Sequence, residues 1–142
     1  MIRHKFVQQG IRLVFRLEED LPAVMADAGQ LGQAFLNLML NAAEAMPGGG
    51  CLTIRGQPDA DSKAGGVTHV RLEFRDTGVG MTAEQCQGAF SAFLGSTKPR
   101  GTGLGLAIVA RMIEAHHGDI SVHSRAGAGT TFRIRLPLQP PD

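Results

Sequence analysis

The sequence contains no tryptophan and no tyrosine among its 142 residues. Proteins that bind single-stranded nucleic acid stack bases on aromatic rings beside clustered lysine and arginine, and this chain has no basic run interleaved with aromatic residues. The formal net charge is only +1, so the composition gives no reason to expect a polyanionic partner. We therefore expect no nucleic-acid binding.

Cysteines and long apolar runs are also scarce. Cys51 and Cys86 are the two cysteines, and they stand far apart without metal-ligand spacing, so we expect both to be reduced and to act as small apolar residues. No apolar stretch reaches the roughly 20 residues that span a bilayer, and the start of the chain lacks the apolar segment of a signal peptide. These absences favour a cytoplasmic domain without membrane contact.

Glycine, in contrast, is abundant, with 19 residues. The glycines gather in short stretches at residues 48–50, 78–80, 101–105 and 127–129. Glycine adopts positive φ and lets the backbone approach a ligand closely. Glycines concentrated in several short loops therefore indicate a ligand that is held by main chain.

The order of predicted elements defines one domain. Alternation of apolar and polar residues predicts strands at residues 11–17, 51–56, 67–75, 119–125 and 130–138. Helical spacing predicts a helix from Asp27, its N-cap, to Pro47, a short helix over 82–90 capped by Thr82, and a helix over 103–118 with Gly118 at the C′ position. We expect an α/β (α+β) two-layer sandwich, with about three helices on one face of a mixed, mostly antiparallel sheet of about five strands. Residues 57–66 and 91–103 are predicted loops, the second of them mobile.

Asn37, Asn41 and Glu44 are the polar residues of interest on the first long helix. Asn37 and Asn41 are four residues apart, so they share one helix face, and Glu44 follows one turn later. Asparagine is disfavoured inside helices, so two on one face need a partner. Their amides either form a solvated polar stripe or provide oxygen ligands for Mg²⁺ and hydrogen bonds for phosphates.

Asp76 ends a predicted strand and is followed by Gly78 and Gly80. This arrangement is either a simple turn or a site where the carboxylate accepts a hydrogen bond from a ligand amino group. In the second interpretation, the glycines let a flat ring lie against the backbone. A buried acceptor of this kind rejects ligands that lack the matching donor.

The segment GTGLGLAIV, residues 101–109, places three glycines at the start of a strong helix. Helix N-termini with glycine-rich approaches bind phosphate through free N–H groups and the helix dipole. The spacing is not that of a P-loop. Lys98 and Arg100 precede the segment, and each is either a solvated surface cation or a partner for phosphate charge.

In this order, the segments resemble the motifs of the family that groups histidine kinases, gyrase, Hsp90 and MutL, which bind ATP in the Bergerat fold. NLMLNAAEAM resembles its N box, DTGVGM its first glycine box, FSAFLGSTK its F box, GTGLGLAIV its second glycine box and GAGTTFRIRLP its closing hairpin. The resemblance extends from about Ile11 to Pro137. It is closest to sensor histidine kinases of the nitrogen-regulation and oxygen-sensor type.

The resemblance implies that the chain binds ATP and Mg²⁺. Asp76 would accept a hydrogen bond from the adenine amino group, and Asn41 would coordinate Mg²⁺ with support from Asn37. Glu44 would lie at the rim, where other subtypes carry a phosphate-binding cation. The base would also contact Gly78, Gly80, Met81 and Thr130. A lid over the triphosphate would comprise Lys98, Gly101, Thr102, Gly103, Leu104, Gly105 and Leu106, anchored by Phe90 and Phe93. The implied catalytic residues are Asn37, Asn41 and Lys98.

Asn37 indicates to which branch of the family the chain is most similar. Branches that hydrolyse ATP, and the related serine kinases, carry a glutamate general base four residues before the Mg²⁺ asparagine. An amide cannot take up a proton, which favours a histidine nucleophile supplied by another domain. The alternatives are a stand-alone ATPase, an anti-sigma-type serine kinase and a nucleotide-dependent interaction module. Gly95 departs from the usual F box, because a threonine or arginine often stands there.

The sequence offers no phosphoacceptor histidine. His4 precedes a lysine and lacks a predicted helix, and His69 and His123 lie in predicted strands. His116 and His117 lie at a helix end, where they are expected to stabilise the helix dipole. We therefore expect residues 1–10 to be a linker remnant and residues 138–142 to be a frayed tail. The expected partners are the phosphoacceptor and dimerisation domain of the same kinase and the receiver domain of a response regulator.

Overall fold

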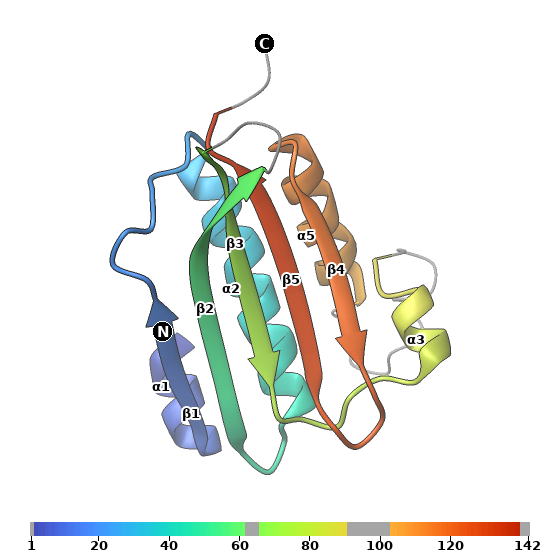
Figure 1. The fold of residues 1–142 in the computed structure, drawn as a ribbon. Helices are drawn as coiled ribbons and strands as arrows, with labels where there is room; N and C mark the ends of the chain where they lie inside the picture. The colour runs from blue at the N-terminus through green and yellow to red at the C-terminus, as the bar shows by residue number, and fades with distance from the viewer. Residues whose placement is uncertain (1, 62–65, 91–102, 140–142) are drawn as a thin grey trace.

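The computed structural model describes residues 2–61, 66–90 and 103–139, and Figure 1 shows the arrangement of their elements. The strands are β1 (Ile11–Leu17), β2 (Gly50–Asp61), β3 (Gly66–Asp76), β4 (Asp119–Ser124) and β5 (Thr130–Pro137). The helices are α1 (Ile2–Gln9), α2 (Ala28–Ala45), α3 (Ala83–Gln87) and α5 (Gly103–Ala115).

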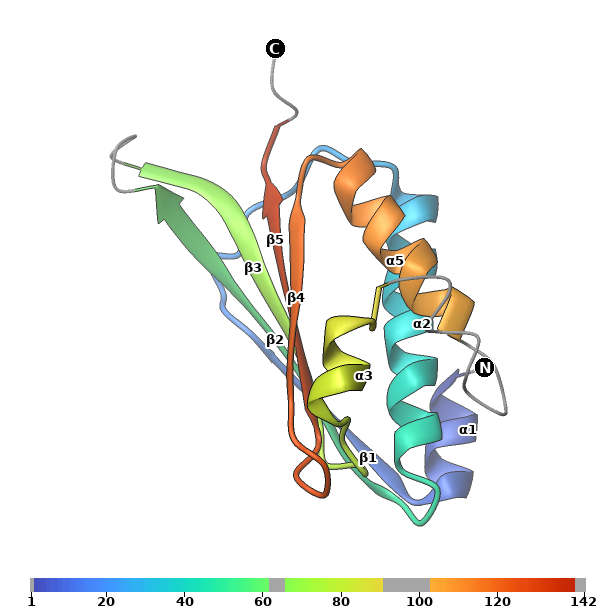
Figure 2. The same cartoon turned by 90° about the vertical axis from the view of Figure 1, so that its right-hand side faces the viewer.

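The strands form one mixed sheet in the order β1-β2-β3-β5-β4. The β1 and β2 strands are parallel and are joined through α2, whereas the pairs β2–β3, β3–β5 and β4–β5 are antiparallel. Figure 2 shows the described helices on one side of the sheet and the other side uncovered. The predicted two-layer sandwich is therefore confirmed.

The core lies between the sheet and the two long helices. Helix α2 contributes Ala34 and Leu38 at helical spacing, and α5 contributes Val109 and Ile113, all at most 1% exposed. Phe132 and other apolar side chains of β5 face them from the sheet. Burying such side chains stabilises the fold by about 1.5–3 kcal/mol each.

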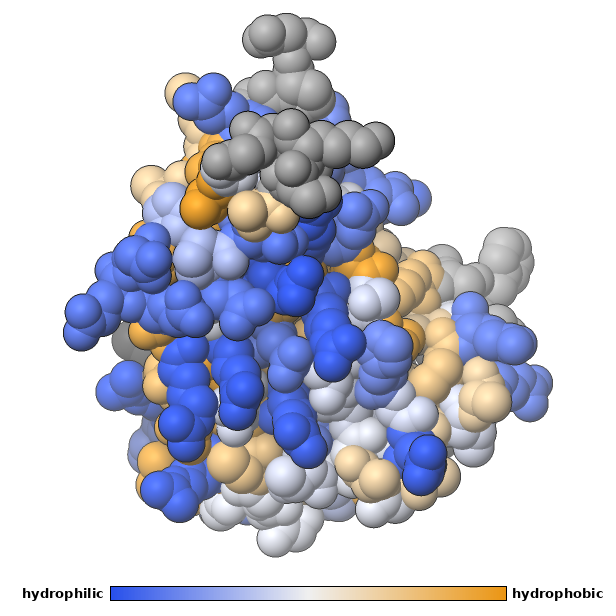
Figure 3. All heavy atoms as spheres, viewed as in Figure 1, coloured by the Kyte–Doolittle hydropathy of each residue, from blue (hydrophilic) through white to orange (hydrophobic). Residues whose placement is uncertain are grey.

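The uncovered face of the sheet is hydrophilic (Figure 3). Arg135 and Arg71 on this face both contact Asp59, at Nε–Oδ2 and Nη2–Oδ2 distances of 2.7 and 3.4 Å. The hydrogen bond from Arg135 is the main reason that the pKa of Asp59 lies below its ordinary value. Polar residues on alternate strand positions explain why this face needs no covering layer.

Helix α2 begins as its sequence predicts. The Asp27 carboxylate accepts a hydrogen bond from the Gln30 N–H at 3.0 Å, which satisfies one of the free donors of the first turn. The short helix α3 has Thr82 as its N-cap and a reciprocal bond from Gln85, so the predicted cap is confirmed. This helix is shorter than the predicted 82–90, because it ends at Gln87.

Three differences from the predicted elements concern strand and chain ends. Residues 2–9 form helix α1, which we did not predict, and it carries His4 and the core residue Phe6, which is 1% exposed. Strand β2 continues to Asp61 through the segment predicted as a loop, because it pairs with β3 over that length. Leu138, placed in the predicted frayed tail, is held by hydrogen bonds with Met25 and Thr68.

The C-terminus of α5 differs from prediction by one residue. His117, not Gly118, adopts the left-handed conformation, with φ of 61°. The N–H groups of His117 and Gly118 donate to the carbonyls of Glu114 and Ile113, which is the Schellman arrangement. Gly118 is needed for another reason, since a Cβ there would lie 2.6 Å from the Arg135 carbonyl oxygen.

His116 stabilises this helix end through hydrogen bonds. Its Nε2 accepts from the Asp27 N–H at 3.1 Å, which leaves Nδ1 as the donor to the Met112 carbonyl oxygen at 2.7 Å. A neutral imidazole satisfies both contacts. The expected interaction with the helix end is therefore made by a hydrogen bond that also ties α5 to the N-cap of α2. No described helix is long and apolar enough to cross a membrane.

His117→Gly is expected to raise the free energy of unfolding by about 0.5–1 kcal/mol, because glycine relieves the left-handed backbone. Glu114→Gly, three residues earlier in the last turn of α5, should instead lower it by about 1 kcal/mol. Urea denaturation of both variants measures the two changes. Destabilisation by His117→Gly would contradict the role assigned to residue 117.

Candidate nucleotide-binding site

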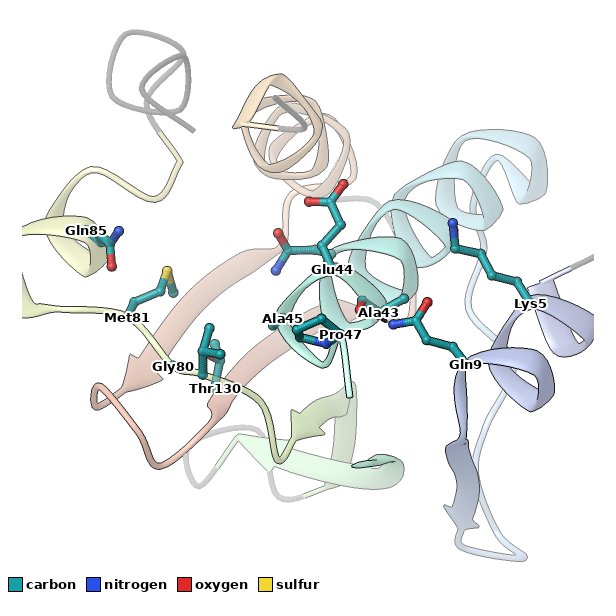
Figure 4. Close-up of a pocket in the computed structure, with 12 residues that line it drawn as sticks. Lys5, Gln9, Ala43, Glu44, Ala45, Pro47, Gly80, Met81, Gln85 and Thr130 are labelled. Carbon is teal, nitrogen blue, oxygen red and sulfur yellow. Dashed lines mark hydrogen bonds between the residues drawn. The ribbon is translucent and has the colours of Figure 1, made fainter. Parts of the chain in front are cut away.

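A cleft of about 670 Å³ lies at the C-terminal end of α2. Figure 4 shows Lys5 and Gln9 of α1 on one side of this helix end and Gly80, Met81 and Gln85 on the other. The volume falls within the range of small-molecule sites, about 300–1,000 Å³. Its described lining consists of Lys5, Gln9, Asn41, Ala43, Glu44, Ala45, Pro47, Val79, Gly80, Met81, Gln85 and Thr130.

Asp76 lies at the end of β3, opposite Thr130 of β5, and is 4% exposed. Its Oδ1 accepts hydrogen bonds from the N–H groups of Gly78 and Thr130 at 2.9 and 3.2 Å. Among the described residues, none donates to Oδ2, so this oxygen can accept from a ligand. Asp76 does not line the cleft itself; its partner Thr130 does.

Burial determines the protonation behaviour of Asp76. Loss of water raises the pKa of its carboxyl above the ordinary 3.8, and the two backbone hydrogen bonds lower it by less. The folded protein therefore carries a carboxylate that is short of hydrogen-bond donors. A ligand that donates a hydrogen bond to it would replace part of the lost hydration.

The glycines after Asp76 are required by contacts within the chain. A Cβ on Gly78 would lie 2.3 Å from the Ala45 carbonyl oxygen at the end of α2. A Cβ on Gly80, which has φ of +73°, would lie 2.0 Å from the Arg125 carbonyl oxygen. The sequence predicts that these glycines let a flat ring lie against the backbone. The structure adds a separate reason for them, which is the close approach of backbone to backbone.

Ser124 is a residue of the site that sequence analysis missed. Its Oγ accepts from the Met81 N–H at 2.7 Å and contacts the Gly129 carbonyl oxygen and Thr130 Oγ1 at 2.9 and 2.8 Å. It therefore joins the loop after Asp76 to the β4–β5 hairpin. Only knowledge of the strand pairing could have identified it, because the sequence shows just a polar residue at a strand end.

The polar residues of α2 take different positions. Asn41 is 7% exposed and lines the cleft, and Glu44 lines it from an exposed position, consistent with the predicted rim. Asn37 lies one turn earlier, where its Oδ1 accepts from Gln33 Nε2 at 3.0 Å. Asn37 does not line the cleft, so the structure brings together Asn41 and Glu44 and leaves Asn37 beside them.

The predicted lid is only partly described. Lys98, Gly101, Thr102 and Phe93 lie outside the described residues, as does the side chain of Leu104 at the start of α5. The side chain of Leu106 is 2% exposed in the core, so a ligand could contact this residue only through its backbone. Phe90 packs on Phe132, with ring centroids 6.1 Å apart.

Lys5, Gln9 and Gln85 also line the cleft, and sequence analysis assigned none of them to a site. Lys5 and Gln9 belong to α1, in a segment interpreted as a linker. Because the moderate amphipathicity of eight residues gives little signal, the position of this helix depends on its tertiary contacts.

A model of the family described as histidine kinase-, DNA gyrase B- and HSP90-like ATPases matches residues 26–140. The chain therefore belongs to this family, which confirms the resemblance found in its motifs. Membership implies ATP binding.

Curated relatives place the chain among sensor kinases. It is 37% identical to sporulation kinase E of Bacillus subtilis over 91% of this chain and 16% of the relative. It is 38% identical to the sensor histidine kinase ZraS of Escherichia coli, over 90% of this chain and 26% of ZraS. It is 39% identical to the histidine kinase/phosphatase NtrB of Rhodobacter capsulatus, over 87% of this chain and 36% of NtrB. The chain thus spans between a sixth and about a third of these relatives.

Solved structures agree. The catalytic domain of histidine kinase ThkA is 32% identical, with a TM-score of 0.80 over 98% of this chain and 86% of that one. ShkA in complex with AMPPNP is 31% identical, with a TM-score of 0.75 over 97% of this chain and 28% of that one. ThkA in complex with the response regulator TrrA is 28% identical, with a TM-score of 0.76 over 98% of this chain and 37% of that one. Within the family, this chain is a catalytic, ATP-binding domain of the two-component sensor histidine kinase type.

The pKa of Asp76 predicts a pH dependence of stability. Because this pKa is raised, the protonated carboxyl stabilises the folded state; the stabilisation is complete below pH 3.8 and is lost as the pH rises through the raised pKa. We therefore expect the free energy of unfolding, relative to Asp76→Asn, to increase as the pH falls from about 7 to about 4. Urea denaturation at several pH values measures it, with Glu73→Gln on the opposite sheet face as control. A difference that does not change with pH would contradict the assignment.

Proposed function

We propose that this domain binds Mg²⁺-ATP and transfers the γ-phosphoryl group to a histidine on a separate dimerisation and phosphoacceptor domain, for onward transfer to a response regulator. The observation that supports it most directly is the buried carboxylate of Asp76, which needs a hydrogen-bond donor, beside a cleft of nucleotide size. Family membership provides ATP as the ligand.

In this proposal, Asp76 recognises the adenine base. The exocyclic amino group of adenine is a donor that suits Oδ2, whereas Oδ1 already accepts from two backbone N–H groups. Gly80, Met81 and Thr130 line the adjoining part of the cleft. A purine that presents an acceptor at this position would leave the carboxylate unsatisfied, so the site should select adenine.

The described residues fit a Mg²⁺ ion that is bound mainly through the nucleotide. They contain no cluster of three or more histidine, cysteine or acidic side chains that could hold a metal alone. Mg²⁺ usually takes one or two protein oxygens together with phosphates and water. Asn41 would provide an amide oxygen from inside the cleft, with Glu44 at the rim. When bound, the ion would neutralise charge that develops on the transferred phosphoryl group.

The nucleophile would come from outside this domain. All five histidines are among the described residues, and none of them lines the cleft. His69 contacts Thr68 Oγ1, and His116 is fixed at the end of α5. Phosphoryl transfer depends mainly on positioning and charge neutralisation, so this domain would orient ATP for a histidine that another domain presents.

A response regulator is the proposed downstream partner. Crystals of the histidine kinase ThkA contain the response regulator TrrA. The similarity of this chain to ThkA supports a receiver domain as the final phosphoryl acceptor. The lid residues Lys98, Gly101 and Thr102 are proposed to contact the triphosphate, and loops of this kind exclude water when they close.

Asp76→Asn is expected to weaken ATP binding by at least about tenfold, because the amide presents N–H toward the adenine amino group and loses the acceptor. Isothermal titration with Mg²⁺-ATP measures the dissociation constant. Glu73→Gln makes the same chemical change on the opposite face of β3 and should bind ATP like the unmodified chain. Equal affinity in all three proteins would refute the assigned role of Asp76.

The chain alone should not become phosphorylated, because its histidines lie outside the cleft. Incubation with γ-labelled ATP, followed by separation of the protein, is expected to leave no acid-labile label on it. Acid-labile label on this chain would show that it contains its own acceptor. Steady release of phosphate that Asn41→Ala abolishes would instead favour a stand-alone ATPase.

A further inference from the structure

We infer that Gln9 is a positioning residue of the nucleotide site, which ties helix α1, through the end of α2, to the loop that follows the base-recognising carboxylate of Asp76. The inference rests on the proposed function in one respect, namely that the ligand of this loop is ATP. It concerns a side chain that contacts the protein backbone and acts on the ligand through the end of α2.

Gln9 holds the last turn of α2 from one side. Its Nε2 donates to the carbonyl oxygens of Ala43 and Met46 at 2.5 and 2.9 Å, and Figure 4 shows the amide directed at Ala43. The last carbonyls of a helix have no partners within it and need donors from elsewhere. At this helix end the Met46 N–H donates to the Ala43 carbonyl oxygen and the Gly49 N–H donates to the Met46 carbonyl oxygen, and Gln9 of α1 adds a second donor to each oxygen.

The loop after Asp76 holds the same turn from the other side. The Val79 N–H donates to the Ala45 carbonyl oxygen at 2.9 Å. Gly78 lets the loop approach, since a Cβ there would lie 2.3 Å from that oxygen. The carbonyls of residues 43, 45 and 46 are therefore shared between α1 and the loop. A change in the position of this turn alters both contacts.

A second set of hydrogen bonds connects the same regions. The Gly10 carbonyl oxygen, directly after α1, accepts from the Gly50 N–H at 3.2 Å. The next residue, Cys51, exchanges hydrogen bonds with Thr77 through its N–H and its carbonyl, at 3.0 and 3.2 Å. Thr77 adjoins Asp76. Phe6, which is 1% exposed, anchors the middle of α1 in the core. The helix is therefore held by Phe6 as well as by the hydrogen bonds at its C-terminal end.

This arrangement predicts reciprocal coupling. If the placement of α1 changes the affinity of the loop for ATP, then bound ATP changes the placement of α1 by the same free energy. In the proposed kinase, a phosphoacceptor domain that contacts α1 would take part in this coupling. Gln9 would then let the position of that domain and the occupancy of the nucleotide site affect each other.

The test compares Gln9→Met, which keeps the length of the side chain and removes its donors, with Gln9→Lys, which restores donors at similar reach. Gln8→Met and Gln8→Lys make the same changes at the exposed neighbouring position and control for apolarity and charge. Two quantities are measured on the whole chain: the dissociation constant of Mg²⁺-ATP and the hydrogen-exchange rate of the Val79 amide.

We expect Gln9→Met to raise the dissociation constant, and to speed exchange at Val79, on the order of fivefold, the low end of measured coupling between sites. Gln9→Lys and both Gln8 variants should stay close to the unmodified chain. A Gln9→Met protein that melts at a lower temperature but keeps its ATP affinity would overturn the inference, because Gln9 would then be structural only.

The two proposals fail in different ways. If the unmodified chain does not bind ATP, the proposed function is wrong, and exchange at Val79 then decides the role of Gln9 alone. Unchanged exchange at Val79 in Gln9→Met would refute the connection between α1 and the loop, whatever the affinity for ATP.

Discussion

Burial of the Asp76 carboxylate is the constraint around which this domain is arranged. The fold removes the group from water and gives one of its oxygens two backbone donors, which is too little to offset the lost hydration and leaves its pKa raised. The loop after Asp76 contacts both the end of α2 and the β4–β5 hairpin, and Ser124 joins this loop to the hairpin. In the proposed function, the ligand supplies the hydrogen-bond donor that the folded chain lacks, so recognition and the cost of folding arise from one side chain.

The last turn of α2 is where the layers of the domain meet. It presents Asn41 and Glu44 to the cleft, accepts a hydrogen bond from the loop at Val79, and accepts two from Gln9. A helix end normally relies on water or a glycine cap for its carbonyls. Here nearby N–H groups bond the carbonyl oxygens of Ala43 and Met46, and Gln9 and Val79 add donors from distant parts of the chain. The chain thus uses the carbonyl groups at a helix end to place the loop after Asp76.

Much of this could be predicted from sequence because periodicity and caps are local signals. The cap at Asp27, the paired strands at the C-terminus and the polar face with Asn41 all follow from residues close together in the chain. Helix α1, the extension of β2 and the role of Ser124 could not be predicted, because each depends on a partner distant in sequence. The assignment of Gly118 failed for a similar reason: its glycine serves a contact with β5, and His117 accepts the strained backbone instead. The roles of Asn37 and Lys98 remain proposals from the resemblance.

The glycines around Asp76 also limit how this site can diversify. Backbone oxygens occupy the space where side chains at residues 78, 80 and 129 would begin, at 2.3, 2.0 and 2.2 Å from an added Cβ. A side chain at any of these three positions would destabilise the fold, whatever its effect on ligand binding. In the proposed function, a descendant of this domain that came to prefer a different base would therefore have to change at side chains such as those of Asp76, Met81 and Thr130, and not at these glycines.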